Sequence, residues 1–451
     1  MKKFDLAVIG AGAGGLNSAL TAASSGLTVV LIERNKPGGE CTWSGCIPSK
    51  ALIQIAKDVK TAQKFSDFEI DTGKIMQDVK ALVHKAHQAE SVDVLTAAGV
   101  TYLHGSASFT STKTLEVNGV EVHANNVIVA TGSSPVVPTI QGLETIDYLT
   151  NEGIFELTEL PKSLIILGAG AIGVELSQAM QRLGVQVSLV DMAPTILPRE
   201  EPDLARLVSQ TLIDEGVEVY TGCRAKSVAY IDSGVQLTVD QGTADVQISG
   251  EKILLALGRK PNTQGIKLEE VGVDVNYKGI IVDEFCETSI KHVFAVGDVA
   301  SPFLFSHTAG HQARSVIRNL VGSERLPVEL DSYAWCTFFE PELARCGLTE
   351  AEARLAHGDT VRVYSASYDD LDRAVVDQKT TGMAKVICDK TGKILGASIL
   401  GERACELLCE LQVLKQHDIP LQELQNTIHP YPGYSELLLG LSLDAYSDFN
   451  S

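Results

Sequence analysis

The segment LAVIGAGAGG spans residues 6–15 and decides the fold of this 451-residue chain. It reads as an apolar strand and a glycine-rich loop, followed by a helix of small residues and a second apolar strand that ends in Glu33. In a dinucleotide-binding fold, Gly10 allows the tight turn, Gly12 lets the backbone approach a pyrophosphate, and Gly15 lets helix and strand pack closely. We therefore predict that a dinucleotide lies on the N-terminus of this helix, with Glu33 against a ribose.

The same pattern occurs a second time in the middle of the chain. Residues 163–173 read SLIILGAGAIG, and the strand after the next helix ends in Asp191. An acid at this place favours a free ribose 2′-hydroxyl, and hence NAD(H) over NADP(H). Two such units predict two bound dinucleotides in one chain, and the glycines of the second loop are Gly168, Gly170 and Gly173.

A pair of cysteines follows the first loop, where residues 38–50 read GGECTWSGCIPSK. Cys41 and Cys46 can close a small disulfide at the start of a helix, beside a nucleotide. Pro48 suits the first turn of that helix, and the helix dipole lowers the pKa of a thiolate at its N-terminus. We predict a disulfide that a neighbouring electron carrier opens and closes. Trp43, between the cysteines, either shapes access for a substrate or packs on the first domain.

Composition excludes several classes of function. The chain has 37 Lys and Arg against 57 Asp and Glu, a formal net charge of −20, whereas nucleic-acid binding needs clustered basic residues. No run approaches the ~18 apolar residues of a membrane span, and the apolar N-terminal run is too short for a signal peptide. We expect no nucleic-acid partner, no membrane segment and a cytoplasmic location.

The nine cysteines form no zinc or disulfide framework, and no metal site is expected. Besides the pair above, most of them are interpreted as isolated structural thiols, Cys336 among them. Cys405 and Cys409 lie one helical turn apart and are interpreted as core residues.

Several further motifs appear in a fixed order. VIVATG covers residues 127–132 and ILLALGRKPN covers residues 253–262, at corresponding points of the two units. VFAVGD follows at residues 293–298, and FEPELARCGLTE at residues 339–350. With the two glycine loops and the cysteine motif, the whole chain resembles the class I pyridine nucleotide–disulfide oxidoreductases, the FAD-dependent family of dihydrolipoamide dehydrogenase, glutathione reductase and mercuric reductase.

The resemblance implies an α/β fold with two Rossmann-like domains, one for FAD and one for NAD, and a C-terminal α+β dimerisation domain. The expected limits are 1–150 for the FAD domain, 151–278 for the NAD domain, 279–328 for a central domain that completes the FAD site, and 329–451 for the interface domain. It also implies a homodimer in which the C-terminal domain of one subunit completes the active site of the other.

The resemblance further implies which residues hold the cofactors. For FAD these are Gly10, Gly12, Gly14, Gly15, Glu33, Arg34, Gly39, Lys50, Ala130, Thr131, Gly132, Gly297 and Asp298. For NAD they are Gly168, Gly170, Gly173, Asp191, Gly258 and Arg259.

By the same resemblance, Cys46 faces the flavin and Cys41 exchanges with the substrate. Lys50 adds positive charge near the flavin, and Glu175 is its expected partner.

The C-terminal segment departs from the family pattern, in which the active-site base is a His followed by Pro, with a Glu five residues after the His. Residues 428–436 read IHPYPGYSE, so two alignments compete. One places Tyr431 at the base position and needs no gap before Glu436; the other keeps His429 and needs an insertion. We favour Tyr431. A histidine with a pKa near ~6.5 accepts a thiol proton at neutral pH, whereas a tyrosine near ~10 acts as a donor, which suits reduction of an acceptor.

The leading hypothesis is an FAD enzyme that passes electrons between NAD(H) and a disulfide, a dithiol or another thiol-reactive acceptor through Cys41–Cys46. A dihydrolipoamide dehydrogenase-like substrate is the first candidate. The alternatives are a mercuric reductase-like enzyme without that family's C-terminal cysteine pair, since residues 442–451 hold no cysteine, and a slowly turning over flavin redox sensor.

Overall fold

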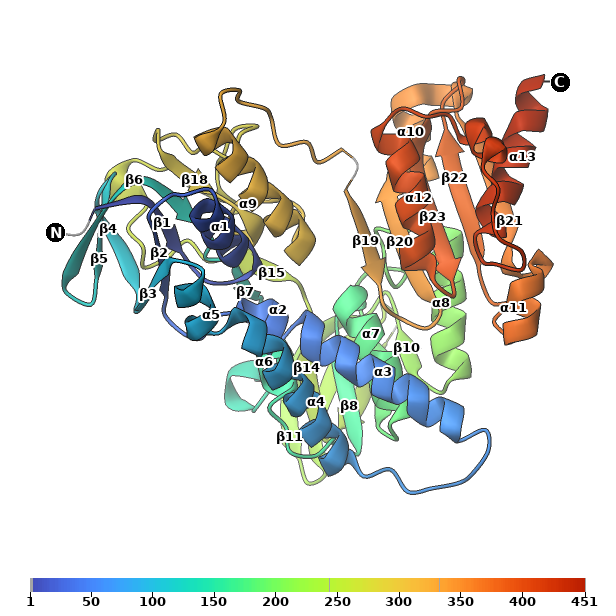
Figure 1. The fold of residues 1–451 in the computed structure, drawn as a ribbon. Coiled ribbons are helices and arrows are strands. Elements are labelled where there is room, and N and C mark those ends of the chain that lie inside the picture. Colours follow the sequence, from blue (N-terminus) through green and yellow to red (C-terminus); the bar gives the residue numbers. More distant parts are fainter. Residues whose placement is uncertain (1–2, 243, 332, 451) are drawn as a thin grey trace.

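The protein has three lobes in the computed structural model, which describes residues 3–242, 244–331 and 333–450. Figure 1 shows the N-terminal lobe on the left, a second lobe below and a C-terminal lobe on the right. A long helix, α3 (Cys46–Ala62), runs from the centre of the molecule beneath the C-terminal lobe. The first residue of α3, Cys46, therefore lies where the lobes meet.

The first lobe is built on a seven-stranded sheet with the order β3-β2-β1-β6-β5-β4, to which β18 (Val293–Ala295) adds by pairing with β6. The strands β1, β2 and β6 run parallel, and Leu6, Ala7 and Val8 of β1 have no exposed surface. Burial on both faces explains why β1 reads as a continuous apolar run. The bounds are β1 (Lys3–Ile9), β2 (Val29–Glu33), β3 (Val100–His104), β4 (Ala107–Ser111), β5 (Thr114–Val117) and β6 (Val120–Val129).

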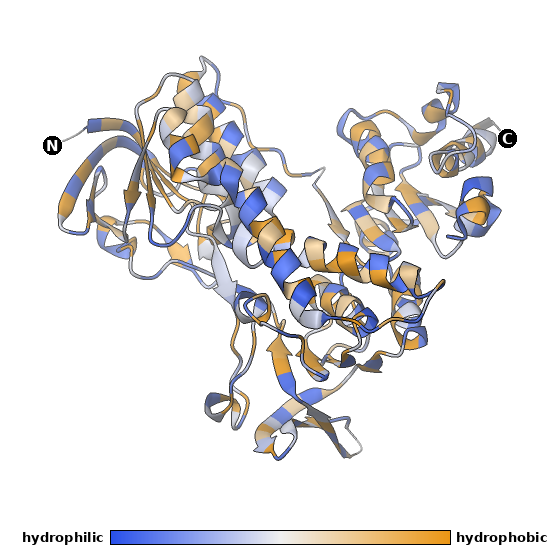
Figure 2. Cartoon of the chain, turned by 60° about the horizontal axis from the view of Figure 1, so that its bottom comes forward, coloured by the Kyte–Doolittle hydropathy of each residue, from blue (hydrophilic) through white to orange (hydrophobic). Residues whose placement is uncertain are grey.

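Helices cover this sheet and extend from it. Helix α1 (Ala13–Ser24) packs against α9 (Ser306–Val321), so a late segment of the chain closes the first lobe. Helix α3 packs on α4 (Thr72–His87), and both are amphipathic, which Figure 2 shows as orange and blue residues along the long central helices. The short helices of this lobe are α2 (Gly39–Trp43) and α5 (Val92–Ala97).

The second lobe repeats the design on a smaller scale. Its four-stranded parallel sheet has the order β10-β9-β8-β14, and α7 packs against α3. A three-stranded antiparallel sheet, β11-β12-β13, adds to it. The bounds are β8 (Ser163–Leu167), α7 (Ala171–Arg182), β9 (Gln186–Val190), α8 (Pro202–Asp214), β10 (Glu218–Tyr220), β11 (Arg224–Ile231), β12 (Gly234–Asp240), β13 (Asp245–Gly250) and β14 (Lys252–Leu255).

The C-terminal lobe is an antiparallel sheet with helices packed on it. The strand order is β19-β20-β23-β22-β21, and α12 packs on β23 and β20. The bounds are β19 (Ala334–Thr337), β20 (Glu342–Gly347), α10 (Glu350–His357), β21 (Arg362–Ser367), α11 (Asp372–Asp377), β22 (Met383–Cys388), β23 (Ile394–Gly401), α12 (Ala404–Gln416) and α13 (Glu436–Asn450).

Short elements join the lobes. β7 (Ser133–Pro135) pairs with β15 (Arg259–Pro261), which links the ends of the two dinucleotide units. The others are α6 (Asn151–Ile154), β16 (Val275–Asn276) and β17 (Gly279–Ile280).

The observed architecture confirms the predicted fold class, with two Rossmann-like units and a C-terminal α+β domain. The domain limits stay a prediction, but β18 shows that residues after the second unit return to the first sheet. Across the described ranges, no helix combines the length and apolar character that a membrane crossing requires.

Candidate functional site

The two glycine loops have matching geometry. Gly10 has φ of +99° and Gly168 has φ of +109°, in the left-handed region that only glycine adopts freely. A Cβ atom on Gly15 would lie 1.8 Å from the carbonyl oxygen of Gly10, and one on Gly173 would lie 1.9 Å from that of Gly168. No side chain fits at Gly15 or Gly173, so each loop holds its helix tightly against its strand.

An acid closes each loop in the same way. The Glu33 carboxylate accepts a hydrogen bond of 2.7 Å from the backbone N–H of Ala11, and Asp191 accepts one of 2.6 Å from Ala169. In the described part of the chain, no side chain caps the N-terminus of α1 or α7. Their first N–H groups are available to a phosphate, and the residues present therefore fit one dinucleotide at each loop.

The cysteine motif lies directly on the first loop. Gly39 has φ of +60°, and a Cβ atom on it would lie 2.6 Å from Cα of Gly12. This close approach sets α2 against the loop and places Cys41 beside the first dinucleotide site. Trp43 packs instead on α4: its ring centre lies 4.5 Å from that of His87, and its Nε1 donates to the carbonyl of Pro37 at 2.8 Å.

Cys41 and Cys46 face each other as free thiols. Cys46 is the first residue of α3 and is exposed, and its Sγ lies 3.7 Å from the hydroxyl of Ser306 on α9. The hydrogen bond from Cys41 lowers the pKa of Cys46 to about 6, with Ser306 and Lys50 adding to the effect. The same hydrogen bond, together with burial, raises the pKa of Cys41. The pair therefore holds one thiolate and one thiol at neutral pH.

The structure brings Lys50 and Glu175 together, as the sequence predicts. The Lys50 Nζ donates to Glu175 Oε2 at 2.8 Å and lies 4.7 Å from the centre of the Phe338 ring. The other carboxylate oxygen of Glu175 accepts a hydrogen bond of 2.8 Å from the backbone N–H of Phe338. This ion pair joins α3, α7 and the segment after β19, one turn along α3 from Cys46.

The side chain of Arg259, which the sequence assigns to the second dinucleotide, has its contacts at the edge of the first unit, and its cofactor role stays a prediction. Its side chain instead forms an ion pair with Glu40 and donates to the Ser133 hydroxyl at 2.7 Å, which itself donates to Asp298 at 2.5 Å. The reason is the pairing of β15 with β7, which turns Arg259 toward the first unit. Desolvation raises the pKa of Glu40, and Arg259 partly offsets this.

The remaining residues predicted for FAD lie around the first loop or at its edge. Ala130 is buried with its carbonyl against Gly10, and the Thr131 hydroxyl donates to the carbonyl of Asn262 at 2.7 Å. Gly14 and Gly297 come close to Val296 and Ala309, whereas Gly132 has open space around it and Arg34 is exposed. Gly258, predicted for NAD, also has open space around it. Their cofactor roles stay predictions.

The two candidate bases of the C-terminal segment differ in burial and in hydrogen-bond partners. The imidazole of His429 is only 4% exposed; Nε2 lies 3.2 Å from Glu410 and Nδ1 lies 3.1 Å from the carbonyl of Thr427. Tyr431 is 70% exposed, and its hydroxyl donates to Asp372 of α11 at 2.9 Å. The Glu436 carboxylate accepts a hydrogen bond of 3.1 Å from the backbone N–H of Gly433.

Two interpretations of other cysteines are wrong. Cys336 is not isolated, because Cys405 and burial raise the pKa of its thiol, and its Sγ donates to the carbonyl of Thr337 at 3.6 Å. Cys405 is only half-buried and Cys409 is exposed, so neither belongs to the core. This interaction depends on α12 packing over β19, which the spacing of cysteines along the chain does not reveal.

Sequence reasoning also missed Ser306, Ser133 and the role of Glu40. Ser306 reaches Cys46 from α9 across 260 residues of sequence, and Ser133 bridges Arg259 to Asp298. For Glu40, its position next to Cys41 is the one signal that the sequence offers.

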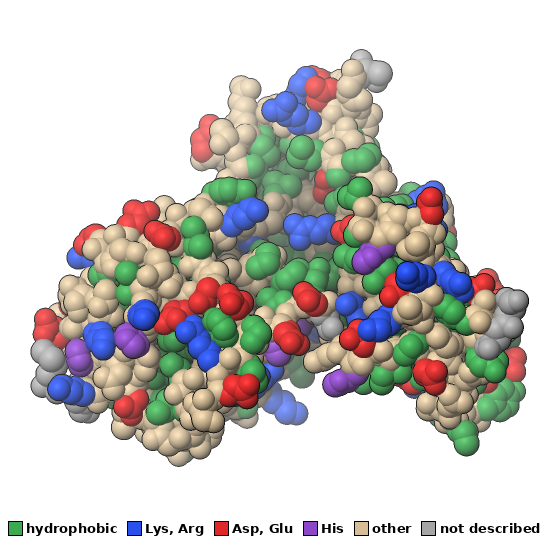
Figure 3. Space-filling model, turned by 90° about the horizontal axis from the view of Figure 1, so that it is seen from above, with side chains coloured by type: hydrophobic (Ala, Val, Ile, Leu, Met, Phe, Trp, Pro, Cys, Tyr) green, Lys and Arg blue, Asp and Glu red, His purple; other side chains and the backbone are tan. Residues whose placement is uncertain are grey.

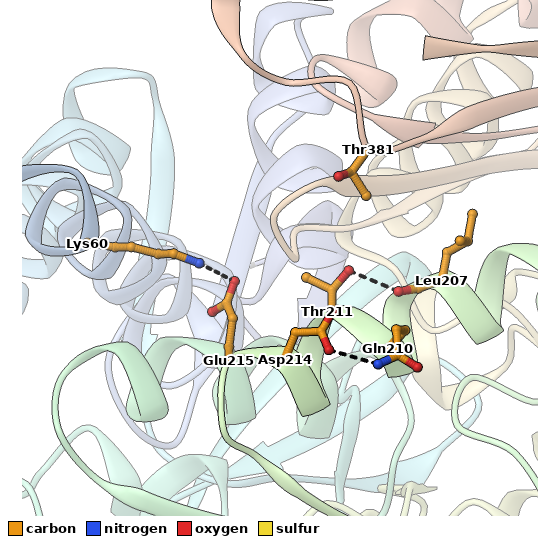
Figure 4. Close-up of a pocket in the computed structure, with 7 residues that line it drawn as sticks. All are labelled: Lys60, Leu207, Gln210, Thr211, Asp214, Glu215 and Thr381. Atoms are coloured by element: carbon orange, nitrogen blue, oxygen red, sulfur yellow. Dashed lines mark hydrogen bonds and ion pairs between the residues drawn. The ribbon is translucent and has the colours of Figure 1, made fainter. Parts of the chain in front are cut away.

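The cavity at the end of α3 does not coincide with the cysteine pair or with the glycine loops. Figure 3 shows a recess between the N-terminal and C-terminal lobes, with hydrophobic and basic side chains on its floor. A separate cavity of about 350 Å³ lies where the end of α3 meets α8, and Figure 4 shows Lys60 reaching Glu215 there. Its lining holds no residue predicted for cofactor or catalysis: Lys60, Leu207, Gln210, Thr211, Asp214, Glu215 and Thr381.

Comparisons with known proteins agree with this geometry. The family model "Pyridine nucleotide-disulphide oxidoreductase" matches residues 4–317, and that family's dimerisation domain matches residues 333–440. The chain is 35% identical to dihydrolipoyl dehydrogenase of Thermus scotoductus, over 97% of this chain and 96% of the relative. It is 30% identical to mercuric reductase of Staphylococcus aureus, over 98% and 82% respectively.

Among solved structures, the Cu(II) complex of the HOCl-induced flavoprotein disulfide reductase RclA of Escherichia coli superposes with a TM-score of 0.88. That match has 29% sequence identity and covers 98% of this chain and 99% of the other. With both family models matched in order and the redox motif seated on the first glycine loop, the chain belongs to the pyridine nucleotide–disulphide oxidoreductases, FAD-dependent enzymes that exchange electrons between NAD(P)H and disulfides.

Proposed function

We propose that this protein uses NADH to reduce a thiol-reactive acceptor by way of the Cys41–Cys46 pair. The first glycine loop would hold FAD, which would supply two-electron transfer between the nicotinamide and a disulfide. Cys46, with its lowered pKa and its place at the start of α3, fits the thiol that faces the flavin. Cys41 then exchanges with the acceptor, and Lys50 with Glu175 orders the groups beside the flavin.

The reductive direction rests on the contrast between His429 and Tyr431. Oxidation of a dithiol needs a base near neutral pH, but the His429 imidazole is buried against Glu410 and Thr427. Tyr431 is exposed, and its hydrogen bond to Asp372 raises the pKa of its hydroxyl. A hydroxyl with a raised pKa donates a proton to a departing thiolate more readily than it removes one from a thiol.

We also infer that the enzyme works as a homodimer. The hydroxyl of Tyr431 binds Asp372 in α11, and Figure 1 places α11 at the outer end of the C-terminal lobe, well away from α2. Tyr431 therefore serves the thiol pair of the other subunit. The match of residues 333–440 to the family's dimerisation domain supports this arrangement.

The favoured acceptor is a disulfide or a thiophilic metal ion taken as substrate. The names of the relatives support this class, since one is mercuric reductase and RclA was solved as a Cu(II) complex. Asp191 at the second loop favours NADH as the donor. All nine cysteines are free, which fits a reducing, cytoplasmic compartment.

The direction is tested by steady-state kinetics on the FAD-loaded dimer. NADH oxidation is measured with lipoamide, glutathione disulfide, Cu(II) and Hg(II) as acceptors, and dihydrolipoamide oxidation with NAD⁺ is measured alongside. We expect acceptor reduction to exceed dihydrolipoamide oxidation. Removing a positioned proton donor costs on the order of 10²-fold, so Tyr431→Phe should slow the favoured reaction strongly, whereas His429→Ala should affect it little.

A matched control is Tyr277→Phe, which removes a hydroxyl from a tyrosine that is 86% exposed in another lobe. This variant should keep the full rate. Fast dihydrolipoamide oxidation that survives Tyr431→Phe and is lost in His429→Ala would overturn the proposed direction.

A further inference from the structure

A chain of polar contacts ends beside Cys41. Glu40, the residue before Cys41 in α2, forms an ion pair with Arg259 of β15. Arg259 also donates to the Ser133 hydroxyl at 2.7 Å and to the Ser133 carbonyl at 3.0 Å. The Ser133 hydroxyl in turn donates to Asp298 at 2.5 Å. The first turn of α2 is therefore tied, through one arginine, to the paired strands β7 and β15.

This ion pair is better protected than an ordinary surface pair. The side chain of Arg259 is 15% exposed and that of Glu40 is 30% exposed, and salt screens partly buried pairs less than exposed ones. The planar guanidinium can hold Glu40 and Ser133 at the same time, which a lysine could not do. Asp298 lies 3.7 Å from Arg259 Nε, so the guanidinium keeps an acidic partner when Glu40 is replaced.

The two neighbours of Cys41 in the chain are both anchored. On one side is Glu40, and on the other is Thr42, whose hydroxyl donates to Glu90 at 2.7 Å. The anchors come from different parts of the fold, because Glu90 directly follows α4 whereas Arg259 follows the second dinucleotide unit. Cys41 is held between them, in the helix that rests on the first glycine loop.

We propose that Glu40 and Arg259 are positioning residues that hold Cys41 ready to close the disulfide with Cys46. Fixing a reacting group in advance spares entropy that would otherwise be lost when the bond forms. Without the ion pair, α2 of the dithiol form is freer, closure of the disulfide costs more, and the disulfide is easier to reduce. This inference rests on the proposed function, in which Cys41 exchanges with the acceptor.

The proposal is tested by the thiol–disulfide equilibrium of the FAD-loaded protein in glutathione buffers without NADH. Two glutathione thiols give two electrons and two protons to the Cys41–Cys46 disulfide and become one glutathione disulfide. Samples are quenched, alkylated and analysed by mass spectrometry. A misplacement of about 1 Å can cost about a hundredfold in rate; because the anchor at Thr42 remains, we expect Glu40→Gln to shift the equilibrium toward the dithiol by roughly tenfold.

A control and a double-mutant cycle identify the ion pair as the cause. Glu152 is exposed and carries a carboxylate near Glu40, and Glu152→Gln should leave the equilibrium unchanged. Arg259→Met should shift it in the same direction as Glu40→Gln, and adding Glu40→Gln to Arg259→Met should give no further shift. The proposal fails if Glu40→Gln has no effect, if Glu152→Gln has an equal effect, or if Glu40→Gln keeps its full effect beside Arg259→Met.

Steady-state kinetics with lipoamide as acceptor give a second readout. Cys46 releases the acceptor from Cys41 by closing the same disulfide, so kcat of Glu40→Gln should fall by roughly tenfold. The KM for NADH should not change, because Glu40 lies on the first loop. A raised KM for NADH with an unchanged kcat would assign the ion pair to the nicotinamide site and overturn the proposal. The glutathione equilibrium needs neither NADH nor acceptor, so failure of the lipoamide assay in unmutated protein reports on the proposed function alone.

Discussion

The two thiol pairs of this protein share a plan and differ in their surroundings. In each pair, one cysteine lies in the first turn of a helix, Cys46 in α3 and Cys405 in α12, and a cysteine on another element lowers its pKa. In each pair this interaction lowers one pKa and raises the other. Two interacting cysteines at a helix start therefore do not by themselves distinguish a catalytic pair.

The difference lies in the charges and partners around each pair. Cys46 has Lys50 nearby, which lowers its pKa further, and the cysteine motif rests on the first glycine loop. Cys405 has Glu406 and Glu342 nearby, and both raise its pKa. Lys50 and the neighbouring cofactor site therefore favour a reactive thiolate at Cys46. At Cys405 the two glutamates disfavour the thiolate, so this cysteine should react more slowly.

Replacing Cys46 or Cys405 by serine should give the largest difference in activity between the two thiol pairs. Cys46→Ser removes the thiol expected to face the flavin, so NADH-driven reduction of the acceptor should fall by about a thousandfold or more, as when an enzyme loses its nucleophile. Cys405→Ser should leave this rate unchanged. Steady-state NADH oxidation measures both. A comparable loss in Cys405→Ser would mean that the pairs act in series, and the comparison would fail.

The pH dependence of alkylation should rank the two thiolates. Because only the thiolate reacts with iodoacetamide, each rate falls as pH drops through the pKa of its cysteine. For Cys46 the midpoint should lie near pH 6, and for Cys405 it should lie above that of Cys46 and below the ordinary value of 9.0. Mass spectrometry of reduced protein, quenched at intervals, measures both at once. A lower midpoint for Cys405 would contradict the assigned roles of Lys50 and the acids.

Much of the first pair could be predicted from the sequence, because its elements are local. A glycine loop, its helix and a nearby cysteine motif have fixed spacings, and the contact of Gly39 with Gly12 follows from their closeness in the chain. The second pair could not be predicted, since Cys336 and Cys405 come near each other only through the packing of α12 on β19. The contact of Ser306 with Cys46 and the ion pair of Arg259 with Glu40 were missed for the same reason, because they depend on the position of α9 and on the pairing of β15 with β7.

The smallest expected effect isolates the contribution of Lys50 to the first pair. In Lys50→Met the positive charge near Cys46 is lost, and an opposite charge within a few ångströms typically shifts a pKa by about 1–3 units. We expect the alkylation midpoint of Cys46 to rise by about one pH unit, the lower end of that range, because Lys50 is partly exposed and already paired with Glu175. The midpoint of Cys405 should not move. Lys57→Met is the matched control, since Lys57 lies on the same helix but pairs with Glu402 and Glu340. An equal rise in Lys57→Met would show that the net charge of α3, and not the local pair, sets the difference between the two thiol sites.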